Sequence, residues 1–85
     1  MRMEKIQKAL TKKNIEFIYT QEDGLGSFDF QFRGLRYHIW EFQEGDSYGA
    51  ETNVRCAGKS EDVLDNYVQI IADEILAWPD MAIPG

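Results

Sequence analysis

The sequence predicts a two-layer α+β domain in the order α-β-β-β-β-α, with a four-stranded antiparallel sheet and both helices on one face. Three observations lead to this prediction: a hairpin with two distinct faces, an amphipathic helix pattern towards each end, and turn-forming residues between the strands. The 85 residues, 44% of them hydrophobic, suffice for one domain with a single core. We expect one domain over residues 1–85, with a frayed tail at 80–85.

The hairpin at residues 28–40 is the clearest feature of the chain. A two-residue turn at Arg33 and Gly34 gives an apolar face that pairs Phe32 with Leu35, Phe30 with Tyr37 and Phe28 with Ile39. The other face then pairs Gln31 with Arg36, Asp29 with His38 and Ser27 with Trp40. A three-residue loop would mix apolar and polar residues on both faces, so the two-residue turn is favoured.

The first helix is expected at residues 3–13. Met3, Ile6 and Leu10 recur there at helical spacing, and lysines occupy the last turn, where they suit the helix dipole. Asn14 is a plausible left-handed end of this helix.

The other two strands are expected at residues 15–20 and 51–57. Glycine-containing turns or loops at 21–27 and 43–49 separate them from the hairpin. In the last strand, alternation predicts Val54 and Cys56 facing inward, with Glu51, Asn53 and Arg55 facing outward.

The second helix is expected to start at Ser60 as its N-cap, with Glu61 and Asp62 in the first turn. It would end at Trp78, before Pro79. Its apolar stripe comprises Leu64, Val68, Ile71 and Ile75, widened by Tyr67 and Trp78.

Charge is distributed unevenly. Residues 1–13 carry five bases and one acid, residues 14–60 four bases and eight acids, and residues 61–85 six acids and no base, for a net charge of −6. A basic first helix beside an acidic last helix would account for this pattern, and so would an acidic flank that attracts a basic partner. Net acidity argues against direct nucleic-acid binding, which requires Lys and Arg to neutralise phosphates.

No apolar run approaches the roughly 20 residues of a membrane span, and the N-terminus has no apolar region typical of a signal peptide. The single cysteine excludes an internal disulfide, and one cysteine with one histidine is too few for a structural zinc site. We expect a cytoplasmic protein with no metal or other cofactor.

The sheet face opposite the helices is the candidate binding surface. It presents a large aromatic among polar residues, and Trp, Tyr and Arg dominate the energetics of protein interfaces. The predicted partner-binding residues are Arg36, His38, Trp40, Tyr48 and Arg55. The same face could also form a homodimer, sheet against sheet.

Acidic residues around the loop at 43–49 form a second candidate surface, comprising Glu41, Glu44, Asp46 and Glu51. These carboxylates lack calcium-loop spacing, and no lysine is placed as in a nuclease motif, so solvated loop acids are the simplest interpretation. An acidic patch could nevertheless bind a basic groove, as phage-type nuclease inhibitors that mimic DNA do; that analogy rests on size and charge.

Catalytic combinations are few. Cys56 and His38 are expected on opposite faces of the sheet, so they cannot act as a nucleophile and base. Asp29 and His38 are directly opposed and could form an acid–histidine pair, although a cross-strand charge pair is the simpler explanation. An enzyme is therefore the less favoured interpretation, and no catalytic residue is assigned.

The block from Glu22 to Arg55 resembles the central part of small uncharacterised bacterial and mobile-element proteins with no assigned activity. The resemblance rests on Glu22-Asp-Gly-x-Gly-Ser-x-Asp-Phe, Arg33-Gly34, Tyr37-His38-x-Trp40-Glu41-Phe42 and Glu51-Thr-Asn-Val-Arg. It covers most of the chain and implies a free-standing single domain.

Three hypotheses follow for function. The first is a non-enzymatic module that binds a protein through the face around Trp40. The second is an acidic inhibitor or nucleic-acid mimic that targets a basic groove of a nucleic-acid-binding enzyme. The third is a small enzyme that uses Asp29 and His38.

Overall fold

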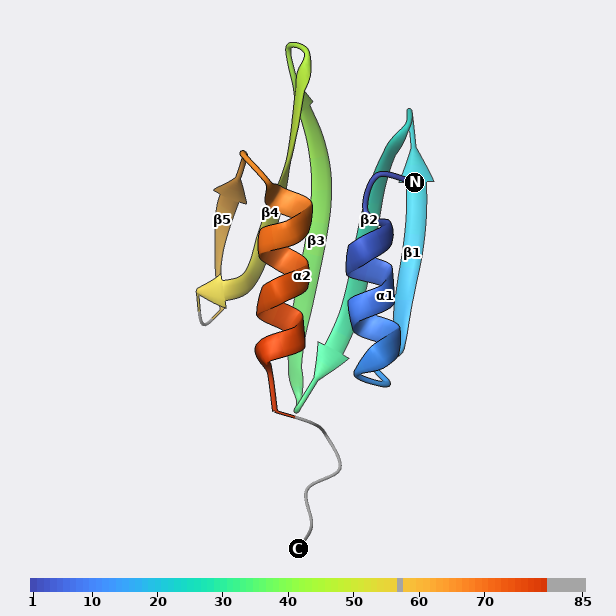
Figure 1. Ribbon diagram of the computed structural model, residues 1–85, viewed down its shortest axis with the longest axis vertical. Helices are drawn as coiled ribbons and strands as arrows, with labels where there is room; N and C mark the ends of the chain where they lie inside the picture. Colours follow the sequence, from blue (N-terminus) through green and yellow to red (C-terminus); the bar gives the residue numbers. More distant parts are fainter. Residues whose placement is uncertain (57, 80–85) are drawn as a thin grey trace, which may run out of the picture.

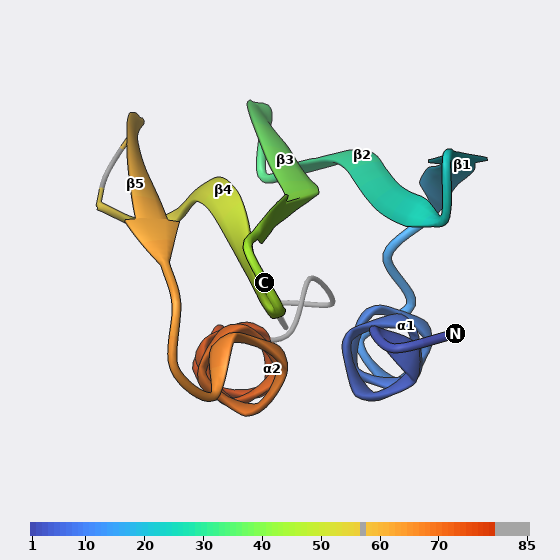
Figure 2. The same ribbon diagram turned by 90° about the horizontal axis from the view of Figure 1, so that it is seen from above.

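The computed structural model describes residues 1–56 and 58–79 and has two layers, an antiparallel sheet and a pair of helices (Figure 1). The elements are α1 (Glu4–Lys12), β1 (Phe17–Glu22), β2 (Leu25–Phe32), β3 (Leu35–Glu44), β4 (Ser47–Cys56), β5 (Lys59–Val63) and α2 (Tyr67–Ala77). The strands lie in the sheet in chain order, and each is antiparallel to the next. Seen from above, both helices lie on the same side of the sheet, with α1 near β1 and β2 and α2 near β4 and β5 (Figure 2). The predicted α+β class is confirmed.

The β2–β3 hairpin has the register that the sequence predicts. The pairs run from Phe32–Leu35 beside the turn to Ser27–Trp40 at the other end. Arg33 and Gly34 form the turn with φ values of 55° and 82°, the left-handed conformation that a type I′ turn requires. The phenylalanines of β2 are therefore buried under the helices.

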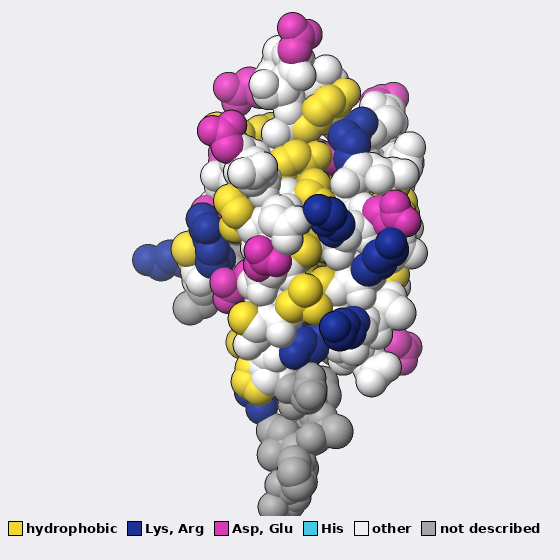
Figure 3. All heavy atoms as spheres, in the orientation of Figure 1, with side chains coloured by type: hydrophobic (Ala, Val, Ile, Leu, Met, Phe, Trp, Pro, Cys, Tyr) yellow, Lys and Arg dark blue, Asp and Glu magenta, His cyan; other side chains and the backbone are white. Residues whose placement is uncertain are grey.

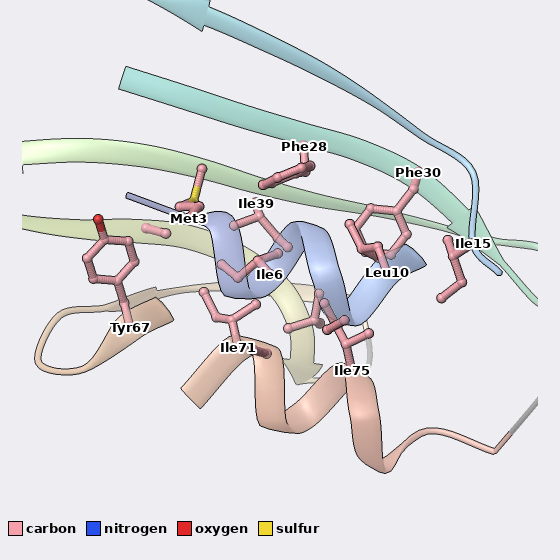
Figure 4. Packing of buried hydrophobic residues seen from close by; sticks show 14 of the residues in the cluster. Met3, Ile6, Leu10, Ile15, Phe28, Phe30, Ile39, Tyr67, Ile71 and Ile75 are labelled. Atoms are coloured by element: carbon pink, nitrogen blue, oxygen red, sulfur yellow. The ribbon is translucent and has the colours of Figure 1, made fainter. Parts of the chain in front are cut away.

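The core fills the space between the sheet and the two helices (Figure 4). Ile6 and Leu10 of α1 and Ile71 and Ile75 of α2 are buried and pack towards Phe28 of the sheet. Most of the two predicted apolar stripes thus faces a common core, which is the arrangement that places both helices on one side. Leu64 of the second predicted stripe is the exception, because it precedes α2 and is 48% exposed.

The first helix and strand differ slightly from their predicted bounds. Asn14 has the predicted left-handed conformation, with φ 57°. The next backbone N–H, that of Ile15, donates to the carbonyl of Leu10 at 2.9 Å and so closes the end of the helix. For this reason β1 begins at Phe17 instead of Ile15, and it extends to Glu22, beside a two-residue Asp23-Gly24 turn.

The predicted count of four strands is wrong, because Lys59–Val63 forms a fifth strand where a helix start was expected. Glu51 pairs with Asp62 in this strand, and the buried Val63 faces the core. Ser60 therefore is not a helix cap, and α2 begins at Tyr67. Ser60, Glu61 and Asp62 resemble the start of a helix. They form a strand instead because pairing with β4 provides hydrogen-bond partners for their backbone groups.

The end of β4 also departs from simple alternation. Its register with β5 shifts between Thr52 and Cys56, so the predicted inward position of Cys56 is wrong and its side chain is exposed. Asn53, predicted to face outward, is only 8% exposed. Its amide accepts from the backbone N–H of His38 and donates to the carbonyl of Arg36, both at 3.0 Å. Asn53 thus supplies the partners that β3 would otherwise lack once β4 diverges from it.

No helix among the described residues is long and apolar enough to cross a membrane. The predicted frayed tail at 80–85 lies outside the described residues.

Candidate interaction surface

The outer face is the side of the sheet that carries no helix. Alternation from the observed registers places side chains from four neighbouring strands on it: Ile18 on β1, Asp29 on β2, Arg36, His38, Trp40 and Phe42 on β3, and Glu51 on β4. It therefore combines aromatic and aliphatic groups with both signs of charge. In the described part of the chain, no helix lies over it (Figure 2), although Leu64, which follows β5, approaches it at Gly49.

Trp40 is the largest side chain on the outer face and remains 44% exposed. Its strand neighbours are Ser27 and Glu51, and neither provides an apolar cover for an indole. The indole N–H donates to Asp29 Oδ1 at 3.2 Å, and the ring centroid lies 4.3 Å from that of His38. Trp40 is thus held in one orientation while much of its ring faces solvent, as predicted.

Phe42 continues the aromatic surface beyond Trp40. It pairs with Gly49, which is on the same face of β4. A Cβ built at this glycine would lie 3.0 Å from the Phe42 ring, 2.9 Å from a methyl of Leu64 and 2.7 Å from the Val63 carbonyl. Only glycine lets these groups approach so closely, so the packing here fixes Phe42 in place.

His38 lies in a polar cluster with Ser60 and Glu51. Its Nε2 is 3.1 Å from Ser60 Oγ and 3.6 Å from Glu51 Oε2. Ser60 was missed because it was assigned to a helix cap, and four of the five residues of Lys59–Val63 are polar, so the segment shows no alternation that would signal a strand. The expected interaction between the Asp29 and His38 side chains is replaced by one between Asp29 and Trp40, because Asp29 accepts a hydrogen bond from the indole N–H.

The serine, histidine and glutamate do not have the geometry of a catalytic triad. In a triad, the acid holds the imidazole nitrogen opposite the one that faces the nucleophile. Here the carboxylate and the hydroxyl both approach Nε2. The arrangement serves better to hold His38 against the Trp40 ring than to activate Ser60.

Two residues predicted for the binding face lie elsewhere or are already paired. Tyr48 faces the helices, where the guanidinium of Arg2 stacks 3.9 Å from its ring centroid. Arg55 makes two hydrogen bonds to the Glu61 carboxylate, at 2.9 and 2.7 Å. These bonds raise the pKa of Arg55 and lower that of Glu61. Of the predicted set, Arg36, His38 and Trp40 remain on the outer face.

The predicted acidic patch is not assembled as one surface. Glu44 and Asp46 lie at the tip of the β3–β4 hairpin, where acidic side chains are visible at the upper end of the molecule (Figure 3). Glu51 is on the outer face beside His38. Lys and Arg side chains gather over α1, on the helical side of the molecule (Figure 3).

Glu41, the fourth predicted acid, is buried on the helical side, with 3% of its side chain exposed. It accepts hydrogen bonds from Arg2 Nε at 2.9 Å, from the Gly26 N–H at 2.9 Å and from the hydroxyl of Tyr67. Burial alone would raise the pKa of this carboxyl, but the hydrogen bonds from Arg2, Tyr67 and Gly26 outweigh it and hold the pKa below its ordinary value. Glu41 is thus a buried carboxylate that holds parts of the fold together rather than part of a docking patch.

Within residues 1–56 and 58–79, no group of three or more His, Cys, Asp or Glu side chains is arranged to hold a metal ion. Cys56 is exposed, and its thiol lies 3.3 Å from Glu61 Oε2. This hydrogen bond, together with desolvation, raises the thiol pKa and keeps the sulfur protonated at neutral pH.

Comparison of the chain with protein-family models, with curated proteins and with solved structures gives no match. The resemblance to small bacterial and mobile-element proteins therefore stays an expectation from the sequence.

Proposed function

We propose that the chain is a protein-interaction module that binds its partner through the outer face, with Trp40 as the central contact. The observation that carries this proposal is that the Trp40 indole is held in place and yet is exposed. Its N–H is bonded and its ring is oriented by His38, yet 44% of the residue faces solvent. A rigid, exposed tryptophan can bury a large area on binding at little cost in conformational entropy.

The surroundings of Trp40 indicate the chemistry of the partner. Phe42 adds apolar area beside it on β3, whereas Glu51 and Asp62 add negative charge on the neighbouring strands β4 and β5. A complementary protein surface would present an apolar centre with Lys or Arg at its edge. Because the acids only border the tryptophan, added salt should weaken binding only modestly.

The acidic-mimic alternative receives less support from the arrangement of the acids. Glu41 is engaged in internal hydrogen bonds, and Glu51 lies on a different face from α2. A mimic that relied on charge would lose affinity steeply as salt increases, which separates it from binding centred on an aromatic residue.

The test compares the native chain with Trp40→Ala and with Leu35→Ala in affinity capture from the native host. Leu35 is an apolar control because it is 59% exposed and belongs to the opposite set of alternating side chains, beside the hairpin turn. Trp40→Ala should lose the principal captured protein, while Leu35→Ala should retain it. Both variants should melt within a few degrees of the native chain, because neither removes a buried side chain. The proposal would be contradicted if Trp40→Ala captured the same protein, or if the melting temperature of this variant fell by a large amount.

A further inference from the structure

The free edge of β1 is a second surface that the proposed outer-face function does not use. Among the described residues, β1 is the first strand of the sheet and pairs only with β2. Its sequence, Phe-Ile-Tyr-Thr-Gln-Glu, contains no Pro, Gly or Lys and is rich in residues that favour strands. Ile18, on the outer face, is 67% exposed, the largest value among the exposed large hydrophobic residues described.

The other edge of the sheet is built differently. β5 has five residues, of which Lys59, Glu61 and Asp62 are charged, and its neighbour β4 is irregular beside it. Short, charged edges next to a bulge are a common way to prevent pairing with another strand. β1 is only one residue longer, but its single charged residue, Glu22, lies at its end beside the turn, and its pairing with β2 has no register shift. Of the two edges, β1 is therefore the one better suited to pairing with a further strand.

The hydrogen-bonding groups at this edge follow from the β1–β2 turn. Asp23 and Gly24 form a two-residue turn between the paired residues Glu22 and Leu25. In such a hairpin the pair that flanks the turn is hydrogen-bonded, and bonded and non-bonded pairs then alternate along the ladder. Ile18 therefore bonds towards β2. The N–H and C=O groups of Phe17 and Tyr19 point away from it, and no described backbone group binds them.

A second copy of the chain can satisfy these groups. When two β1 strands meet antiparallel about a twofold axis through Ile18, Phe17 of each copy faces Tyr19 of the other and exchanges backbone hydrogen bonds with it. The two Ile18 side chains then form a close, non-hydrogen-bonded pair on the outer face, where their exposed area is buried.

The positions of the charged residues favour this register of the two β1 strands over registers shifted along the strand. A twofold axis through Tyr19 would set Glu16 of one copy opposite Glu22 of the other, which is unfavourable. An axis through Thr20 would set Ile18 opposite Glu22. The axis through Ile18 places Glu16 opposite Thr20 and Ile18 opposite Ile18. This register therefore avoids both the contact between two glutamates and the contact between an isoleucine and a glutamate.

From this edge we infer that the chain forms a symmetric homodimer through β1–β1 pairing, which joins the two sheets into one. The outer faces of both copies lie on the same side of that joined sheet. Trp40 stays uncovered on β3, so the dimer presents two copies of the proposed partner-binding face. The dimer does not depend on that function, because Trp40 does not contribute to the β1 edge.

The test is sedimentation velocity of the native chain, Ile18→Lys, Ile18→Glu and an equimolar mixture of the two variants, over ~1 µM to ~1 mM protein. The native chain should dimerise in this range, and each single variant should raise the dimer dissociation constant about 10-fold or more through like-charge repulsion. The mixture should recover dimer, because the ammonium group of one variant then faces the carboxylate of the other across the axis.

Two controls locate the contact. Trp40→Ala should dimerise as the native chain does, which separates this edge from the outer-face function. Hydrogen exchange of the Phe17 and Tyr19 amides should slow as protein concentration increases, while exchange in β5 should not change. The inference is overturned by a native chain that is monomeric throughout, by a dimer that persists in both single variants, or by a mixture that remains monomeric.

Discussion

Nε of Arg2 lies 2.9 Å from Oε2 of Glu41, so an ion pair joins the N-terminal residues to the middle of β3 across 39 positions of sequence. Arg2 also donates to the carbonyl of Gly24 and stacks on Tyr48, and Tyr67 of α2 donates to the same carboxylate. One buried acid thus connects the start of α1, the sheet and the start of α2.

Replacement of Glu41 should therefore destabilise the fold far more than replacement of an exposed acid of the same strand. Glu41→Ala leaves the Tyr67 hydroxyl, the Gly26 N–H and the Arg2 guanidinium without their shared acceptor, and we expect a loss of about 3 kcal/mol in unfolding free energy. Glu44→Ala is the matched control, because Glu44 is exposed at the end of β3, and should cost less than about 0.5 kcal/mol. Urea denaturation of both variants measures the difference; equal losses would show that the Glu41 cluster contributes no special stability.

The same carboxyl should make stability depend on acid pH. Its pKa in the fold is below the ordinary value of 4.5, so its contribution is fully present above about pH 4.5. That contribution is lost as pH falls through the lower, folded-state pKa, because the unfolded chain takes up the proton first. The native chain should consequently lose stability more steeply than Glu41→Gln as pH falls below about 4.5, measured by denaturation at each pH. Parallel curves for the two proteins would refute the assignment.

The hairpin could be predicted residue by residue because alternation is strong in β2 and β3 and only one loop length keeps apolar side chains on one face. The exposed position of Trp40 followed from the same register, since Ser27 opposite it is too small to cover it. These inferences needed only neighbours within a few residues of a tight turn, where local sequence determines geometry most directly.

What the sequence could not predict depends on contacts between distant residues. Lys59–Val63 has little apolar content, and its strand is stabilised by pairing with β4 and by the Arg55–Glu61 ion pair. Tyr48 and Glu41 were placed on surfaces because nothing in their local pattern signals Arg2, which lies far away in sequence. Tertiary contacts thus overrode a local helix-start signal and removed two residues from the candidate sites.

Cys56 should react with a thiol reagent in the native state, because its side chain is exposed instead of buried. The reaction should nevertheless be slow at neutral pH, since the hydrogen bond to Glu61 raises the thiol pKa and little thiolate is present. Glu61→Gln should lower that pKa and shift the pH–rate profile for a disulfide reagent towards lower pH. Stoichiometric labelling only after addition of denaturant would show that the thiol is buried, and an unchanged profile in Glu61→Gln would show that the carboxylate does not control it.

Gly49→Ala should destabilise the fold more than Gly26→Ala, although both glycines lie on β strands with close neighbours. At Gly49 the new Cβ would lie 2.7 Å from the Val63 carbonyl, a backbone atom of β5 that can move only if the strand moves. At Gly26 the obstructing atoms belong to the Tyr19 side chain, whose hydroxyl end can rotate away at the sheet edge. We expect a loss of about 2 kcal/mol for Gly49→Ala and less than about 1 kcal/mol for Gly26→Ala, measured by chemical denaturation. The reverse order would mean that Phe42, Leu64 and β5 are not packed around Gly49, and the support for the aromatic surface beside Trp40 would be lost.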